Sequence, residues 1–285
     1  LPKEALPLIY KYGIYNVKEK SFVAFEEGDN RLLHGDAHNK KLTIVHDGFV
    51  RMANNTWKGA GVSIPVFSLK SNRSFGVGEF TDLKLLADWA QKTGIKMIQL
   101  LPVNDTTSTN TFKDSYPYAA ISTFALHPLY INLDATAGRR HPLVKSLRKK
   151  QQQLNELPDL DYEQVIQFKL SALKELFAKE KDTFLADKNF KKFFEESRQW
   201  LIPYAAFCYL RDRNGTADFL QWKLYSDYDQ SSIEKYVSPK AKHYTDIAFT
   251  YYLQYHLHLQ LKDAVEYAHE KNVIIKGDIP IGVNR

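Results

Sequence analysis

The chain has 285 residues, enough for one large domain or two smaller ones. Hydrophobic residues make up 44% and charged residues 25%, which are ordinary globular values and exclude a largely disordered chain. The net charge of +6 is scattered, without the basic stripe and interleaved aromatics of a nucleic-acid interface, and no apolar run reaches transmembrane length. We therefore expect neither a nucleic-acid nor a membrane partner.

Two further features of the composition bear on function. Aromatic residues reach 13%, which suits a sugar-binding protein, whose rings stack on pyranose faces, or simply a large aromatic core. The single cysteine, Cys208, lies in an apolar helical context, where a buried inert thiol is expected rather than a nucleophile. One free thiol favours a reducing compartment and predicts a cytoplasmic location. Because the sequence begins with Leu1 rather than Met, we also expect that a preceding segment was removed.

Residues 1 to about 56 have the pattern of a small antiparallel β-module. Alternating side chains predict strands at Ile9–Tyr15, Phe22–Phe25 and Leu42–Val45, separated by clusters of Gly, Asn and Asp. Three such strands are too few to bury a core alone.

The pattern changes at about residue 57. Gly61–Phe67 predicts a strand, Asp82–Gly94 carries apolar residues at helical spacing, and Lys96–Leu101 predicts a second, buried strand. Thr81 or Asp82 can cap the helix. Together these segments form a βαβ unit, the building block of a parallel sheet.

A long polar loop from Pro102 to about Asp134 follows. Loops of this length in compact domains are usually functional, and loops after the carboxyl ends of parallel strands build active sites. Residues 140 to about 272 are mostly helical, with apolar stripes at 165–177, 190–204 and 251–271. Val273–Pro280 then predicts a third buried strand.

The predicted fold class is α/β. We expect residues 57–285 to form a partial (β/α)₈ TIM barrel with a large helical insertion at about 140–250, preceded at 1–56 by part of a β-sandwich module. A closed barrel needs eight strands and this part supplies three, so we expect a truncated barrel with exposed strand edges near Arg285.

Asp278 is the most informative acidic residue, because it follows the carboxyl end of an apolar strand, where barrel enzymes place functional groups. We favour a carboxylate that holds a sugar hydroxyl or orients a catalytic neighbour. A helix or turn cap, or an ion pair with Arg285, is the structural alternative.

The long loop contains a second candidate, Asp114, Ser115, Tyr116, Pro117 and Tyr118. Proline fixes the backbone between two tyrosines, so the loop can stack a ring on a glucosyl unit and hydrogen-bond its hydroxyls. An Asx turn with packed aromatics explains the pattern equally well.

Other chemistries lack their sequence signatures. His256 and His258 point to different helix faces, and no Cys, His and Asp cluster indicates a metal. Gly76-Val77-Gly78 lacks the rest of a dinucleotide fingerprint, and there is no nucleophile elbow of a serine hydrolase. We expect no cofactor and no metal.

Read together, several segments resemble the 4-α-glucanotransferases of the amylomaltase and disproportionating-enzyme family. The resemblance runs in order across residues 58–285. It is carried by Gly59–Leu69 with Gly76–Phe80, by Gln99–Val103, by Asp114–Tyr118 with Ser122–Ile131, and by Tyr255–Gln260 with Lys276–Val283. The inserted Tyr116 and the His-Leu-His-Leu-Gln helix are similar to the plant-type disproportionating-enzyme-2 branch.

That branch carries starch-binding modules before its barrel. Tyr10–Tyr12 and Phe25–Arg31 resemble the end of a glucoamylase-type starch-binding module. By position, Lys11, Phe25 and Asn30 match one of its glucan sites, with Phe25 where the family usually has Trp.

The resemblance implies transfer of α-1,4-glucan segments with retention, through a carboxylate nucleophile and a carboxylic acid about 5–5.5 Å apart. It places the nucleophile, the acid/base and a stabilising Asp beyond Arg285, and makes Asp278 a lining residue of the donor subsite. The expected partners are α-1,4-glucans such as maltodextrin, glycogen or starch. A non-catalytic starch- or glycogen-binding protein and a hydrolase of the wider α-amylase group are the alternatives.

Overall fold

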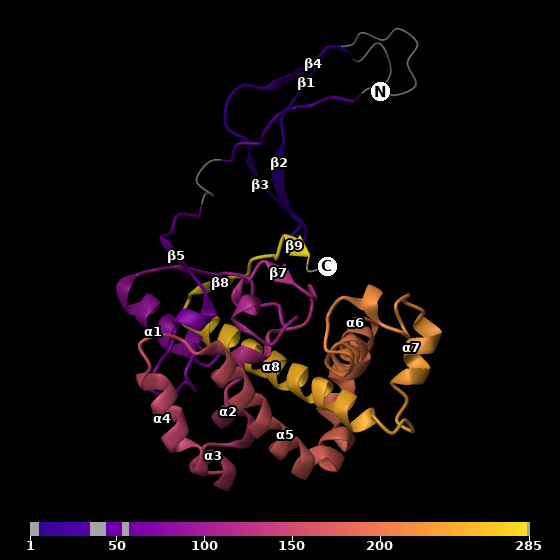
Figure 1. Cartoon of the computed structure of the whole chain (residues 1–285). Coiled ribbons are helices and arrows are strands. Elements are labelled where there is room, and N and C mark those ends of the chain that lie inside the picture. Colours follow the sequence, from indigo (N-terminus) through magenta and orange to yellow (C-terminus); the bar gives the residue numbers. More distant parts are fainter. Residues whose placement is uncertain (1–5, 35–43, 53–56, 284–285) are drawn as a thin grey trace. The chain divides into compact units, whose positions relative to one another are not determined.

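The computed structural model describes residues 6–34, 44–52 and 57–283, and it divides into two compact units, residues 1–58 and 59–285. Figure 1 shows the elements of both units.

The N-terminal unit contains two short antiparallel pairs. Strand β1 (Leu8–Tyr10) pairs with β4 (Arg31–Leu33), and β2 (Gly13–Asn16) pairs with β3 (Ser21–Phe25). The prediction of one strand over Ile9–Tyr15 is wrong, because the chain changes partner there. Between the two strands the backbone of Tyr12 bonds to Glu26, donating to its carboxylate at 3.0 Å and accepting from its amide at 2.9 Å.

Two further strand expectations in this unit have different outcomes. The predicted strand at 42–45 begins outside the described residues, and its described part, Ile44 and Val45, is in no strand and is exposed. Strand β4 was not predicted, because three residues are too few to show an alternating pattern.

A small polar network holds this unit together. Among its described residues only Glu26 is buried. The Glu26 carboxylate accepts from Arg31 at 2.6 and 2.7 Å, and Asp47 accepts from the hydroxyls of Tyr10 and Tyr12 at 2.6 and 2.5 Å. The hydrogen bond from Arg31 is the main cause that lowers the pKa of Glu26 to about 2. The expectation that these strands bury no core alone is met in the part of the unit that the structure describes.

The C-terminal unit is built on a three-stranded parallel sheet with the order β5 (Gly61–Ile64), β6 (Met97–Leu100), β8 (Ile274–Lys276). Helix α1 (Asp82–Thr93) connects the first two strands, which confirms the predicted βαβ unit. Strand β5 is shorter than expected because Pro65 starts a 3₁₀ turn at Val66–Ser68. Gly94 follows the last residue of α1 and caps the helix, with a φ of 78° in the left-handed conformation that favours glycine.

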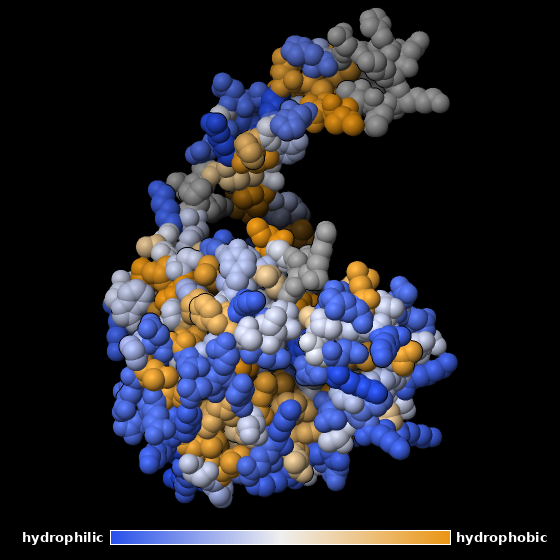
Figure 2. Space-filling model, viewed as in Figure 1, coloured by the Kyte–Doolittle hydropathy of each residue, from blue (hydrophilic) through white to orange (hydrophobic). Residues whose placement is uncertain are grey.

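After the long loop, most of the sequence up to β8 is helical, as expected. After the short helices α2 (Leu133–Ala137), α3 (Pro142–Ser146) and α4 (Arg148–Glu156) come α5 (Tyr162–Ala186), α6 (Lys188–Asn214) and α7 (Gln230–Tyr236). Helix α8 (Tyr244–Glu270) leads into β8 and starts earlier than its apolar stripe suggested. It packs against α1, α5, α6 and β8, so it crosses the unit from the helical region to the sheet (Figure 1). The face of this unit seen in Figure 2 is mostly hydrophilic, with apolar groups scattered over it.

A buried ion pair joins the helical region to the βαβ unit. Lys169 of α5 and Glu79, before α1, form a salt bridge in which both side chains are fully buried. The Lys169 ammonium also donates to the carbonyls of Leu129 and Ile131 at 2.7 and 2.9 Å, and Asn132 donates to Glu79. Burial raises the pKa of Glu79 to about 7 and lowers the pKa of Lys169, while their mutual attraction opposes both shifts.

Removing one partner of this pair should be costly. We expect Lys169→Met to lower the free energy of unfolding by about 3–5 kcal/mol, because it leaves Glu79 buried without its cation. The double variant Lys169→Met/Glu79→Gln should recover a large part of that loss. Urea denaturation measures both. Lys179→Met is the control on the same helix, since Lys179 pairs with Glu175 at the surface and should cost about 1 kcal/mol or less. Equal losses from the two single variants would contradict this role.

His256 should make stability depend on pH. Its imidazole packs against Tyr252, Phe184 and Tyr255 with ring centroids 4.4, 6.4 and 5.6 Å away, and burial lowers its pKa to about 4. The folded state therefore binds fewer protons than the unfolded state below the unfolded pKa of about 6.5, and stability is lost as pH falls from there towards 4. We expect a loss of about 1 kcal/mol per pH unit that His256→Leu removes. Urea midpoints at pH 7.5, 6 and 5 test this, and parallel pH profiles for both proteins would refute it.

Candidate functional site

The long loop and the end of β8 meet at one hydrogen bond. Asp278 lies two residues after β8, and its carboxylate accepts from the hydroxyl of Tyr118 at 3.0 Å. This bond is the main cause that raises the pKa of Tyr118. The two residues are 160 positions apart in the sequence, so the contact is a product of the fold. It places a partly exposed carboxylate at the carboxyl end of a parallel strand, where sites of α/β proteins form.

Backbone pairing holds the same two segments together. Strand β7 (Ala119–Ala120) runs parallel to β9 (Gly282–Val283), and the amide of Gly282 donates to the carbonyl of Tyr118 at 3.0 Å. A Cβ on Gly282 would lie 2.5 Å from that carbonyl oxygen, closer than real Cβ contacts allow. Glycine is therefore required for the strand end to approach the loop.

Tyr116 offers the stacking surface that was expected of this loop. Its side chain is 62% exposed, and its ring centroid lies 5.7 Å from that of half-buried Tyr118. Ser115 beside it is half-buried. Tyr118 links this exposed ring to the Asp278 carboxylate. A ring can contact the apolar face of a sugar, and a carboxylate can accept from its hydroxyls.

Asp114 has a different environment from its neighbours. It is 3% exposed, and its carboxylate accepts from the amides of Thr109 and Asn110 and from the hydroxyls of Ser108 and Thr109. These bonds run back to residues 108–110 and not forward as in an Asx turn, and they fold the loop around the Asp114 carboxylate. A direct contact between Asp114 and a glucan stays a prediction.

A small cavity of about 250 Å³ lies beside Asp114. Ser115, Pro117, His127 and Tyr162 are among its lining residues. His127 Nδ1 accepts from the amide of Leu129 at 3.1 Å, and burial lowers the pKa of His127. The ring is held as a neutral acceptor by its surroundings. His127 was not among the site residues predicted from the sequence. Its position in the His-Pro-Leu-Tyr segment is the feature of the sequence that could have indicated it.

Buried polar residues near the start of the loop were also missed. The carboxylate of Asp105 accepts from Tyr204 of α6 at 2.6 Å and from the hydroxyl of Thr107 at 2.6 Å. The guanidinium of Arg211 donates to the carbonyl of Thr107 at 2.5 Å and pairs with Asp212. In the sequence, the only signals for these residues are an Asp that follows a strand and an Arg within an apolar helix. Neither signal shows which distant group the side chain will bond to.

The three N-terminal candidates occupy neighbouring backbone positions. Tyr10 pairs with Arg31 at the end of the β1–β4 ladder, and Lys11 and Asn30 are their neighbours in the sequence. Phe25 pairs with Gly13 across β2 and β3. Phe25 is 59% exposed and its ring lies 4.5 Å from that of Phe22. Binding of glucan by these residues stays a prediction, and the proposed pairing of Asp278 with Arg285 lies outside the described residues.

The described residues contain neither a membrane-spanning helix nor a cluster of metal-binding side chains. No helix there has the length and apolarity to cross a membrane. Within the same ranges, no group of three or more His, Cys, Asp or Glu side chains has a metal-binding arrangement.

Comparison with known proteins identifies relatives of this chain. The glycoside hydrolase 77 family model, described as 4-alpha-glucanotransferase, matches residues 64–285. The 4-alpha-glucanotransferase DPE2 of rice (Oryza sativa subsp. japonica) is 42% identical over 288 residues, covering 100% of this chain and 30% of the rice protein. The 4-alpha-glucanotransferase of Chlamydia muridarum is 33% identical over 255 residues, covering 87% of this chain and 46% of that protein. The chain thus spans less than half the length of either relative.

The fold has solved counterparts. Amylomaltase from Streptococcus agalactiae, solved in complex with acarbose, superposes with a TM-score of 0.62 at 22% identity, covering 80% of this chain and 44% of that one. Amylomaltase from Corynebacterium glutamicum gives a TM-score of 0.59 at 20% identity, with 79% and 30% coverage. With the family match over residues 64–285, these likenesses lead to one conclusion: the chain belongs to the 4-alpha-glucanotransferase family of glycoside hydrolases, family 77.

Proposed function

We propose that this chain is part of a 4-α-glucanotransferase that moves α-1,4-glucan segments between glucans or to glucose, with retention. The observation that supports this proposal most directly is the hydrogen bond between Tyr118 and Asp278, both of which lie within the residues matched by the family model. The chain's share of the rice relative supports the further proposal that the catalytic carboxylates follow Arg285 and that residues 1–285 alone are inactive.

The residues at hand suit substrate binding rather than bond cleavage. Asp278 keeps acceptor capacity after taking the Tyr118 hydrogen bond, so it can accept from sugar hydroxyls. Tyr116 supplies an exposed ring face beside Tyr118, which donates to Asp278. Binding several sugar units in a fixed register would position the scissile bond for two carboxylates about 5–5.5 Å apart in the retaining mechanism.

The remaining parts of the proposal concern the barrel, the N-terminal unit and location. We propose that β5, β6 and β8 are strands of a (β/α)₈ barrel. We also propose that residues 1–56 are the end of a starch-binding module, in which Lys11, Phe25 and Asn30 bind glucan. The expected partners are α-1,4-glucans. A single cysteine supports a cytoplasmic location.

The binding role of this site can be tested by substitution. We expect Asp278→Asn to weaken maltoheptaose binding by about 1.5–3 kcal/mol, since it removes a charged acceptor, and Tyr116→Ala by about 0.5–1.5 kcal/mol. Tyr118→Phe should have a smaller effect through the orientation of Asp278. Isothermal titration calorimetry measures all three. Tyr228→Ala is the matched control, because Tyr228 is 65% exposed like Tyr116 but lies elsewhere. If the control and Tyr116→Ala behave alike, the stacking role is wrong.

The transferase activity has its own test. The protein from the full reading frame, incubated with maltotriose, should produce glucose and longer maltodextrins without a net rise in reducing ends, while residues 1–285 alone should not. Chromatography of the products and a reducing-end assay read this out. A rise in reducing ends would instead indicate a hydrolase. Binding without any product would favour the non-catalytic glucan-binding alternative.

A further inference from the structure

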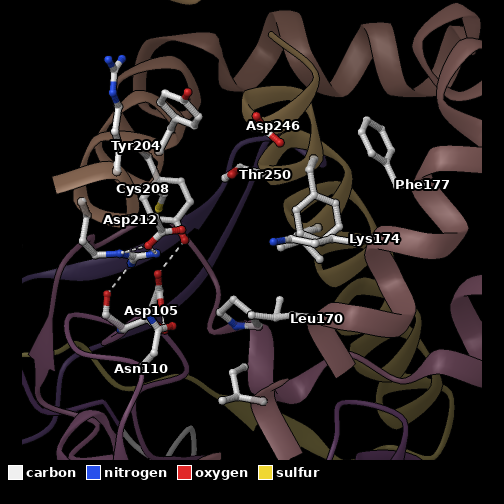
Figure 3. Close-up of a pocket in the computed structure, with 18 of the residues that line it drawn as sticks. Asp105, Asn110, Leu170, Lys174, Phe177, Tyr204, Cys208, Asp212, Asp246 and Thr250 are labelled. Carbon is white, nitrogen blue, oxygen red and sulfur yellow. Dashed lines mark hydrogen bonds and ion pairs between the residues drawn. The ribbon is translucent and has the colours of Figure 1, made fainter. Parts of the chain in front are cut away.

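A cavity of about 520 Å³ lies among α5, α6 and α8, away from the Tyr118–Asp278 contact. Figure 3 shows its walls, with Lys174 and Phe177 of α5 facing Cys208 and Asp212 of α6. Residues of the long loop, including Asp105, close one end. Neither tyrosine of the loop nor Asp278 is among the lining residues. The volume lies within the usual range of small-molecule sites, about 300–1,000 Å³.

The floor of this cavity combines ring faces with hydrogen-bonding groups. Phe177, Tyr204 and Phe249 are buried lining residues that present aromatic surface. The buried Asp105 carboxylate beside them accepts from Tyr204 and Thr107.

The buried guanidinium at this end of the cavity has spare donors. Arg211 uses three of its five N–H groups, in the bonds to Asp212 and to the carbonyl of Thr107. Two N–H donors remain, and Arg211 and Asp105 line the same cavity. Acceptors, donors and flat apolar faces within one pocket are what a pyranose ring requires.

The rim carries balanced charge. Lys174 and Arg213 are exposed cations, and Asp212 and Asp246 are exposed anions on the same rim. Lys174 lies over the ring of Phe249 at 5.7 Å. With Arg211 and Asp105 the lining holds three positive and three negative side chains. A phosphate or carboxylate ligand would meet Asp212 and Asp246, so this balance favours a neutral, hydroxyl-rich ligand.

We propose that this cavity is a second saccharide site, which takes a neutral glucose-class sugar or the end of an α-1,4-glucan. It lies apart from the Tyr118–Asp278 site and does not rest on the transferase activity. The long loop connects the two. Asp105 lines the cavity, and its backbone bonds to Ile121 and Ala125, just after Tyr118. Sugar bound at Asp105 therefore contacts the loop that carries Tyr116 and Tyr118.

Cys208 provides a reporter for this cavity, because it is the single cysteine of the chain and lines the floor. Burial raises the pKa of its thiol to about 12, so labelling by methyl methanethiosulfonate is slow and is followed over hours at about pH 9. Mass spectrometry of the Cys208 peptide gives the rate. At maltose tenfold above its dissociation constant, that rate should fall about tenfold. Acetylation of Lys174, with Lys179 as internal reference, is the second readout from the same digest.

Variants separate this site from the other one. Lys174→Ala/Asp246→Ala should raise the maltose concentration for half-protection about fivefold or more, because both rim side chains are exposed and their loss spares the core. Tyr116→Ala should leave the protection of Cys208 unchanged, even where it weakens maltoheptaose binding. If the proposed function is wrong, the Tyr116 and Asp278 variants will bind maltoheptaose as the unchanged protein does, while maltose will still protect Cys208.

Three results would overturn the proposal. The first is no protection of Cys208 or Lys174 by maltose up to about 100 mM, a hundredfold above a millimolar dissociation constant. The second is protection by glucose 6-phosphate alone, which would make the cavity an anion site. The third is equal protection by sorbitol, an open-chain polyol without a ring face, which would show a general solvent effect.

Discussion

The C-terminal unit depends on the buried ion pair between Lys169 and Glu79. A buried charge is tolerated only with a partner and further hydrogen bonds, so the position of each side chain constrains the other. The Lys169 ammonium also donates to the carbonyls of Leu129 and Ile131, and the Glu79 carboxylate accepts from the side chain of Asn132. One contact therefore ties the helical region, the start of α1 and the end of the long loop to each other.

Helix α8 holds the loop in a second way. The side-chain amide of Gln254 exchanges two hydrogen bonds with the backbone of Leu126, both at 2.8 Å. Six residues further along the helix, Gln260 does the same with Asn132 at 2.8 and 3.0 Å. Because α8 leads into β8, the helix that forms these hydrogen bonds with the loop also positions Asp278. This explains how a long polar loop can present Tyr118 to a carboxylate so far away in the sequence.

The two proposed sugar sites use the loop differently. At the β8 end, an exposed tyrosine and a partly exposed carboxylate are open to a long chain. Among α5, α6 and α8, buried rings, Asp105 and Arg211 line a cavity of about 520 Å³ with a charged rim. The first arrangement suits a polymer that extends past the site, and the second suits one or two sugar units.

The sequence by itself determined the types of the main elements, the βαβ unit and the family, because apolar spacing and a set of ordered motifs are local properties. It also placed Asp278 after a strand and Tyr116 in a loop. Only the tertiary structure decided that Asp114 turns inward, that Tyr118 meets Asp278 and that Ile9–Tyr15 divides into two strands. It alone brought Asp105, Tyr204 and Arg211 to one cavity. Each of these outcomes depends on a partner distant in the sequence, and the residue pattern around a side chain does not specify which distant group will take its hydrogen bond.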